Sequence, residues 1–405
     1  MTDTLRSRDA KDTEDAVRWA VSGGKALEVV GAGSKRAVGR PSQSDLTLDL
    51  SGLRGVTLYE PAELVLSAKA GTPLAEIEAL VEANGQELAF EPVDLGPLLG
   101  GPAGVGTIGG ALATNLSGPR RLKAGAARDH FLGVTAVSGR GETFKSGGRV
   151  VKNVTGYDLC KVPAGSWGTL AVMTDVTVKT LPRAECTQTV LVLGLDAARA
   201  VAAMTLAMGS ACDVSGAAHL PAAATARIPV GAVAAAGGAV TALRLEGVGP
   251  SVTHRQAALQ ALLQPHGPLA TLADEDSRAL WRAVRDVVPF ANDDRALWRI
   301  STAPSNGAEV GARILAAGDA ELVFDWAGGL IWAALAPCDD AGAQAVRAAL
   351  GGNGHATLIR APAALRAAVD VFQPQEPGLA ALTKRLKESF DPSGVLNPGR
   401  MWAGV

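Results

Sequence analysis

Aromatic side chains and excess charge are both scarce in this sequence. Only 4% of its 405 residues are aromatic, and 38 basic residues nearly balance 40 acidic ones, for a net charge of -2. Nucleic-acid surfaces depend on clustered positive charge and, for single strands, on aromatic rings that stack with bases. We therefore expect no nucleic-acid partner and no direct attraction to an anionic membrane surface.

Long hydrophobic runs are also missing, although 47% of the residues are hydrophobic. A membrane-spanning helix needs about 20 mainly apolar residues in succession, and the apolar stretches here are short and rich in alanine. The opening residues, MTDTLRSRDAKDTED, lack the apolar centre of a signal peptide. We expect no transmembrane segment and a cytoplasmic protein, which partner proteins could hold at the inner face of the cell membrane.

Cysteine is rare and never clustered. The four cysteines are isolated in the sequence and form no C-x-x-C pair. Structural zinc sites and iron–sulfur clusters are held by closely spaced cysteines. The sequence thus predicts no metal site and no iron–sulfur cluster in this chain.

Two common nucleotide-binding motifs are absent although glycine is abundant. No G-x-x-x-x-G-K-[ST] occurs, so nothing supports a P-loop. The stretch VVGAGSKR at 29–36 begins like the dinucleotide fingerprint G-x-G-x-x-G, but Arg36 replaces the third glycine, and Gly39 and Pro41 argue against a following helix. We interpret it as a loop whose backbone N–H groups hold phosphate, with Lys35 or Arg36 adding charge.

A second glycine-rich stretch, AGVGTIGGALATNLSG at 103–118, has the same character. It opens a predicted helix at Gly109 and Gly110, where backbone N–H groups and the helix dipole favour an anion. Two such loops in one domain indicate a nucleotide with two phosphates.

The expected secondary structure changes character near Pro182. Before it, we predict a helix at 72–85 with Thr72 as its N-cap, and a hairpin at 133–148. After it, strand and helix patterns alternate from 186 to 360 and predict two ferredoxin-like halves.

Five segments, in this order, resemble the FAD-binding domain of the vanillyl-alcohol oxidase and p-cresol methylhydroxylase (PCMH) superfamily. They are VVGAGSKR, EPVDLGP, GTIGGALATNLSGPRRLKAGAARDHFLGV, VVKNVTGYDLCKVPAGSWGTLAVMTDVTVK and DPSGVLNPGRM. Within it, the chain most resembles the FAD-binding subunits of bacterial glycolate oxidases. The resemblance implies an α+β fold: a two-subdomain PCMH-type FAD-binding domain at 1–183, a ferredoxin-like α+β cap domain at 184–360, and a C-terminal segment at 361–405 that returns to the FAD-binding domain.

The resemblance also implies which residues bind FAD. The first loop would wrap the pyrophosphate, and the second would lie along the pyrophosphate and the flavin ring. Since none of the five histidines lies in either loop, we expect FAD to be bound non-covalently. The implied cofactor-binding residues are Gly31, Ala32, Gly33, Ser34, Lys35, Pro92, Val93, Asp94, Thr107, Gly109, Gly110, Thr114, Asn115, Gly168, Ala171, Val172 and Asn397.

Catalytic residues are marked less clearly. Related flavoproteins hold a metal through a motif resembling H-x-G-D-G-N-x-H, whereas this chain has only the fragment GNGH, which ends at His355. Oxidation of a 2-hydroxy acid needs a cation for the carboxylate and a base for the hydroxyl proton. The candidates are Arg299, His355 and Arg360.

The resemblance implies the FAD-binding subunit of a glycolate or other 2-hydroxy-acid oxidase complex that forms glyoxylate from glycolate. A second FAD-binding catalytic subunit and an iron–sulfur subunit would be its partners, and electrons would pass through the latter to quinone. Two alternatives stay open. One is a stand-alone FAD-dependent oxidoreductase of a sugar acid or aldonolactone. The other is a subunit whose flavin relays electrons or is structural, and the missing histidine motif favours a relay.

Overall fold

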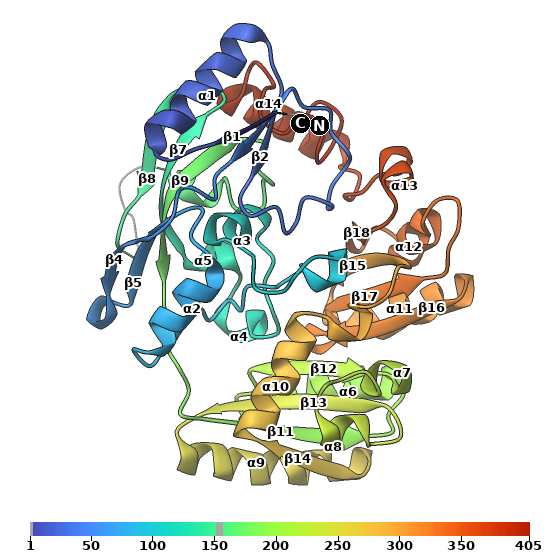
Figure 1. Cartoon of the computed structure of the whole chain (residues 1–405). Coiled ribbons are helices and arrows are strands. Elements are labelled where there is room, and N and C mark those ends of the chain that lie inside the picture. The colour runs from blue at the N-terminus through green and yellow to red at the C-terminus, as the bar shows by residue number, and fades with distance from the viewer. Residues whose placement is uncertain (1–2, 151–156) are drawn as a thin grey trace. The chain divides into compact units, whose positions relative to one another are not determined.

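The computed structural model describes residues 3–150 and 157–405, which form two units (Figure 1). The first unit comprises Met1–Ser117, Gly125–Arg183 and Pro374–Val405, and the second comprises Gly118–Ala124 and Ala184–Gln373. The sequence analysis divided the chain at residues 183 and 360. It did not predict that residues 118–124 belong to the second unit, and the chain returns to the first unit at Pro374 and not at residue 361. Residues 151–156 of the segment VVKNVTGYDLCK lie outside the described residues.

The strands of the first unit form two larger sheets and one small pair. A parallel sheet has the order β1-β3-β2, an antiparallel sheet has the order β4-β5-β9-β7-β8, and β10 pairs with β6. The antiparallel pairing of β7 with β8 confirms the predicted hairpin. Their bounds are β1 Asp3–Arg6, β2 Leu27–Val30, β3 Leu46–Asp49, β4 Val56–Glu60, β5 Val65–Lys69, β6 Gln86–Glu87, β7 Phe131–Ser138, β8 Thr143–Gly147, β9 Ala171–Lys179 and β10 Leu181–Pro182.

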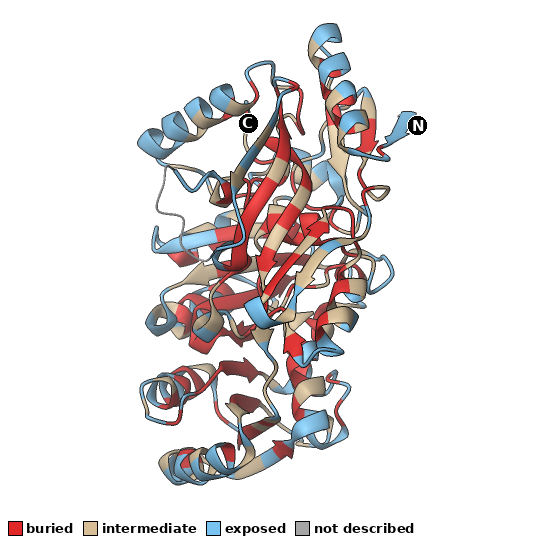
Figure 2. Cartoon of the chain, turned by 90° about the vertical axis from the view of Figure 1, so that its left-hand side faces the viewer, coloured by how far each residue is buried: buried red, intermediate tan, exposed pale blue. Residues whose placement is uncertain are grey.

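Helices α2 and α3 pack their apolar faces on the antiparallel sheet. Ile77 of α2 and Leu112 of α3 share a buried core with Phe131 and Val176 of the sheet, and Figure 2 shows buried residues concentrated along the strands. Helix α2 begins at Leu74, not after Thr72 as predicted, because the Thr72 hydroxyl donates to the Lys69 carbonyl at 2.7 Å and leaves Pro73 as the N-cap. The helices are α1 Ala10–Gly23, α2 Leu74–Glu82, α3 Ile108–Thr114, α5 Ala127–His130 and α14 Pro377–Phe390.

The C-terminal segment returns to the first unit, as the resemblance implied. The Leu27 N–H of β2 donates to the Val395 carbonyl at 2.8 Å, and the Asn397 N–H donates to the Leu27 carbonyl at 2.9 Å. The buried Lys387 ammonium donates to Asp391 at 2.7 Å and to the Thr169 carbonyl at 2.7 Å. The last residues of the chain are therefore part of the core that carries β2.

The second unit is built on one antiparallel sheet in the order β14-β11-β13-β12-β16-β17-β15-β18. Each half runs strand, helix, strand, strand, helix, strand, apart from the short helices α7 and α8 in the first half. This is the predicted ferredoxin-like order, and β12 and β16 join the halves. The strands are β11 Cys186–Leu193, β12 Gly216–Leu220, β13 Val240–Gly247, β14 Leu269–Ala273, β15 Ala296–Thr302, β16 Ala320–Asp325, β17 Leu330–Leu335 and β18 Gly354–Arg360. The helices are α4 Arg121–Ala124, α6 Ala197–Met208, α7 Ala222–Thr225, α8 Gly231–Ala234, α9 Gly249–Leu263, α10 Asp274–Arg285, α11 Gly307–Ala317, α12 Ala343–Leu350 and α13 Ala363–Ala368.

A buried ion pair fastens the segment 118–124 to the rest of the second unit. Arg120 donates to Glu246 at 2.6 Å, and both side chains are nearly buried. Burial alone would raise the pKa of Glu246, but the charges of Arg244 and Arg120 and hydrogen bonds from Arg120 and Ser215 bring that pKa down to about 2. The carboxylate is therefore ionised at neutral pH and holds the segment electrostatically.

Candidate functional site

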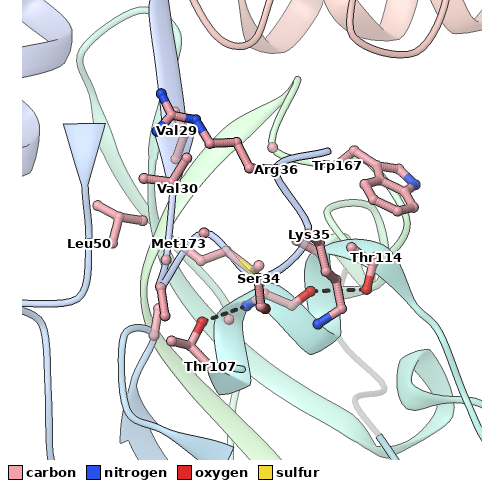
Figure 3. Close-up of a pocket in the computed structure, with 18 of the residues that line it drawn as sticks. Val29, Val30, Ser34, Lys35, Arg36, Leu50, Thr107, Thr114, Trp167 and Met173 are labelled. Atoms are coloured by element: carbon pink, nitrogen blue, oxygen red, sulfur yellow. Dashed lines mark hydrogen bonds between the residues drawn. The ribbon is translucent and has the colours of Figure 1, made fainter. Parts of the chain in front are cut away.

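A pocket in the first unit brings the two glycine-rich stretches together (Figure 3). It encloses about 720 Å³ of empty space, its open mouth included. The predicted cofactor-binding residues that line it are Gly31, Ala32, Gly33, Ser34, Lys35, Thr107, Gly109, Gly110, Thr114, Gly168 and Ala171.

Glycine is required where the two stretches meet. A Cβ on Gly31 would lie 2.5 Å from Thr107 Oγ1, and a Cβ on Gly109 would lie 2.8 Å from the Ala70 carbonyl oxygen. Either distance is shorter than van der Waals contact, so a side chain at either position would push the pocket walls apart. Gly33 has a φ of +76°, which places it in the left-handed region that glycine adopts most easily.

The backbone N–H groups of the two stretches differ in availability. In α3, the Gly109 N–H donates to the Ala70 carbonyl at 2.8 Å, and the Gly110 N–H donates to Thr107 Oγ1 at 3.2 Å. The sequence analysis expected these first-turn N–H groups to bind an anion, but both already donate to acceptors within the protein. In the first loop, by contrast, the N–H groups of residues 31–35 find no acceptor among the described residues. The first loop is the part of the pocket suited to hold phosphate oxygens.

Lys35, and not Arg36, supplies positive charge to the pocket. The Lys35 side chain is buried, with 8% of the residue exposed, and no described residue accepts a hydrogen bond from its ammonium. Burial lowers its pKa, and the charge of Asp94 opposes that shift only in part. Arg36, although it also lines the pocket, is paired with Glu28 at 2.7 Å. A buried cation without a hydrogen-bond partner favours an anionic ligand beside it.

Residues that the sequence analysis did not single out complete the pocket. Arg400 donates to the backbone carbonyls of Lys35 at 3.0 Å and Val38 at 3.3 Å, and its guanidinium lies 5.7 Å from the centre of the Trp167 ring. Trp167 and Met173 add apolar surface to the wall. The signal for Arg400 was its place in DPSGVLNPGRM, one of the segments that carry the resemblance.

The remaining predicted residues are not among those that line the pocket, and several of them hold its walls. Asn397 accepts from the Val29 N–H at 2.8 Å and donates to the Trp167 carbonyl at 2.9 Å, so it joins two walls. Asp94 accepts from the Gly104 N–H at 2.7 Å and fixes the loop that leads to α3. The residues in this group are Pro92, Val93, Asp94, Asn115, Val172 and Asn397.

The three catalytic candidates belong to the second unit, where they differ sharply. Arg360 donates to the backbone carbonyls of Arg295 at 3.0 Å and Phe290 at 2.7 Å, so its guanidinium is engaged in structural hydrogen bonds. Arg299 on β15 and His355 on β18 come from adjacent strands and interact electrostatically. The structure therefore brings together Arg299 and His355 but not Arg360.

Two further features concern metals and membranes. In residues 3–150 and 157–405, no group of three or more His, Cys, Asp or Glu side chains is arranged to hold a metal ion. Within the same ranges, no helix combines the length and the apolar character needed to cross a bilayer.

Comparisons with known proteins place the chain in the class of FAD-dependent oxidoreductases. The family described as "FAD binding domain" matches residues 4–147. Glycolate oxidase subunit GlcE of Escherichia coli (strain K12) is 33% identical over 390 residues, 96% of each chain. Glycolate oxidase subunit GlcD of Bacillus subtilis (strain 168) is 31% identical over 160 residues, 39% of this chain and 32% of the relative.

A solved structure of p-cresol methylhydroxylase with substrate bound shares the fold. It superimposes with a TM-score of 0.72 at 13% identity and covers 99% of this chain and 88% of its own. The chain belongs to the family of the glycolate oxidase subunit GlcE, and it has an FAD-binding domain. It is thus a flavoprotein whose cofactor is FAD and whose class is oxidoreductase.

Proposed function

We propose that this chain is the FAD-carrying subunit of a complex that oxidises glycolate, or another small 2-hydroxy acid, to the corresponding 2-oxo acid. The similarity to subunit GlcE over nearly the whole chain supports this assignment. The observation that carries its FAD-binding part is the buried Lys35 ammonium beside the N–H groups of residues 31–35, none of which has an acceptor among the described residues. When bound, FAD supplies the acceptor for the hydride taken from the substrate.

The residues of the pocket fit a non-covalently held FAD. The N–H groups of residues 31–35 and the Lys35 ammonium would hold the diphosphate, and the apolar wall formed with Trp167 and Met173 suits a flat ring system. No histidine or cysteine is among the described residues that line the pocket. We therefore expect denaturation to release the flavin from the protein.

Electrons must leave the flavin after each oxidation. We propose that they pass to a separate iron–sulfur subunit and on to quinone, and that a second FAD-binding catalytic subunit completes the complex. The two relatives named as glycolate oxidase subunits support a multi-subunit assembly. In such an assembly the chain would be cytoplasmic and held at the membrane only through its partners.

One bleaching experiment tests the proposal and separates its alternatives. The purified chain is loaded with FAD, made anaerobic and mixed with glycolate, alone or with the partner subunits. Bleaching of the flavin absorbance by glycolate alone indicates that this subunit oxidises the substrate itself. Bleaching that requires the partners, and that exceeds the bleaching of the partners without this chain, indicates an electron relay. Bleaching by an aldonolactone or a sugar acid but not by glycolate, or no bleaching under any condition, would refute the proposed function.

A further inference from the structure

Two arginines of the second unit lie against the same indole ring. The guanidinium carbon of Arg121 is 4.5 Å from the centre of the Trp326 ring, and that of Arg299 is 5.0 Å from the same centre. A cation above an indole is stabilised by the ring quadrupole, and this contact leaves the N–H groups of the guanidinium available. No described residue accepts a hydrogen bond from either guanidinium. Both side chains therefore have unused donors.

The sheet register adds a histidine to the same place. Arg299 on β15 is opposite Thr357 on β18, and Ser301 is opposite His355. Because side chains alternate along a strand, these four residues point to one face of the sheet, while Trp298 points to the other and is buried. His355 is exposed to solvent, but partial desolvation of its ring and the charges of both arginines, Arg299 first, lower its pKa. Its ring is therefore neutral at pH 7 and offers one donor and one acceptor.

The backbone that carries Trp326 is held in an unusual conformation. Trp326, Ala327 and Gly328 have φ values of 52°, 56° and 100°, so three successive residues lie in the left-handed region. The Trp326 N–H donates to Asp325 at 2.7 Å, and its indole N–H donates to the Gly118 carbonyl at 3.0 Å. Left-handed conformations in non-glycine residues cluster at functional sites, where surrounding contacts hold them in place. Here they fix the ring that both arginines contact.

The local charge is unbalanced. Burial and, to a smaller extent, the charge of Arg121 lower the pKa of Arg299 to about 10, and the charge of Asp325 opposes the shift. The Asp325 carboxylate already accepts the Trp326 N–H. Two cations and one engaged acid leave a net positive charge, which an anionic ligand would neutralise.

We propose that Arg121, Arg299 and His355 form a carboxylate-binding site around Trp326. The forked guanidinium groups match the two oxygens of a carboxylate, and the neutral imidazole can hydrogen-bond a neighbouring hydroxyl group. The ligand is therefore a small 2-hydroxy carboxylate, and this choice, unlike the anion site itself, rests on the proposed function.

Calorimetric titration of the full-length, FAD-loaded chain with oxalate tests the site, because oxalate is a small carboxylate that cannot be oxidised as a hydroxy acid. We expect Arg121→Gln and Arg299→Gln each to weaken oxalate binding by about tenfold or more. Arg282→Gln is the matched control, since Arg282 is an exposed arginine of the same unit, and should leave the affinity unchanged. FAD affinity should be the same in all three variants, and Arg121→Gln alters an exposed side chain, so it is expected to fold.

Each outcome has one meaning. No oxalate binding by the unmodified chain, or equal binding by Arg121→Gln and Arg299→Gln, would overturn the site. Inorganic phosphate that binds as tightly and displaces oxalate would overturn its assignment to carboxylates. Oxalate binding that depends on both arginines, in a chain whose flavin glycolate never bleaches, would sustain the site and refute the proposed function.

Discussion

The guanidinium of Arg400 donates a hydrogen bond to the backbone carbonyl of Lys35 at 3.0 Å, across 365 positions of sequence. A second bond from the same group reaches the Val38 carbonyl at 3.3 Å. Because both carbonyls belong to the loop that begins at Gly31, the last turn of the chain fixes the shape of that loop. The loop conformation is therefore a tertiary property and not a local one.

Removal of this anchor should loosen FAD binding. Arg400→Met leaves two carbonyls without their donor, which costs about 1–3 kcal/mol of stability. We expect a lower melting temperature and weaker FAD binding in a fluorescence-quenching titration. Arg385→Met, which changes an exposed arginine of α14, should have neither effect. Equal FAD affinity in both variants would contradict an anchoring role for Arg400.

Lys35→Met should have opposite effects on the two forms of the protein. With FAD, loss of a charge-assisted contact of roughly 1.5–3 kcal/mol should weaken binding about ten- to a hundredfold. Without FAD, the variant should melt higher, because a buried unpaired cation has been removed. Arg36→Met should leave FAD affinity nearly unchanged, since Arg36 is paired with Glu28. A similar loss of FAD affinity in both variants would show that Lys35 does not contact FAD more directly than Arg36 does.

The same lysine predicts a pH dependence of the FAD-free chain. Burial lowers its pKa below 10.5, the usual value, so the unfolded chain binds more protons than the folded chain between these two pKa values. Stability contributed by this group therefore rises as the pH approaches 10.5. Thermal unfolding across alkaline pH should show this gain in the unmodified chain and not in Lys35→Met.

Gly31→Ala should distort the pocket through Thr107. The new Cβ would lie 2.5 Å from Thr107 Oγ1, and such overpacking typically costs about 1–3 kcal/mol. Thr107→Ala removes the obstructing atoms, so the double variant should lose less stability and FAD affinity than the two single variants together. Gly378→Ala, where a Cβ meets no atom within 4 Å, is the control. Strict additivity of the single variants would rule out the predicted clash.

Acid should weaken the second unit through Glu246. Its pKa is about 2 in the folded chain against an ordinary value of 4.5, so its stabilising effect is complete above pH 4.5 and is lost as the pH falls toward 2. The shift corresponds to roughly 3 kcal/mol. Glu246→Gln should lower the melting temperature at pH 7 and flatten the decline between pH 4.5 and pH 2. An equally steep decline in that variant would mean that other carboxylates cause it.

Local sequence patterns predicted the hairpin at 133–148 and the architecture of the second unit, whereas the fold of the first unit was implied by the family resemblance. The helix and strand periods of residues 186–360 gave two ferredoxin-like halves, and the sheet order confirms them. The first loop was interpreted as a phosphate loop because Arg36 replaces the third glycine of the dinucleotide motif, and the N–H groups of residues 31–35 have no described acceptor. In these cases the decisive feature lies within a few residues.

The less predictable features depend on partners that are distant in sequence. Lys35 and Arg36 are adjacent cations, and only the position of Glu28 on β2 shows that Arg36 is engaged. The first-turn N–H groups of α3 are taken by Ala70 and Thr107, which periodicity does not reveal. Arg121 joins Arg299 because Trp326 contacts both of them, across about 200 positions of sequence.

The excursion at Gly118–Ala124 makes both units discontinuous in the sequence. The chain passes between them after Ser117, Ala124, Arg183 and Gln373. A gene fragment that encodes residues 184–373 would lack Arg120, whose partner Glu246 would remain as a buried acid, and would also lack Arg121. Recombination that exchanged one of these units for a homologous one would need matched breaks at all four places. The two units are thus expected to be inherited together, and divergence of this chain should proceed by substitution and not by exchange of domains.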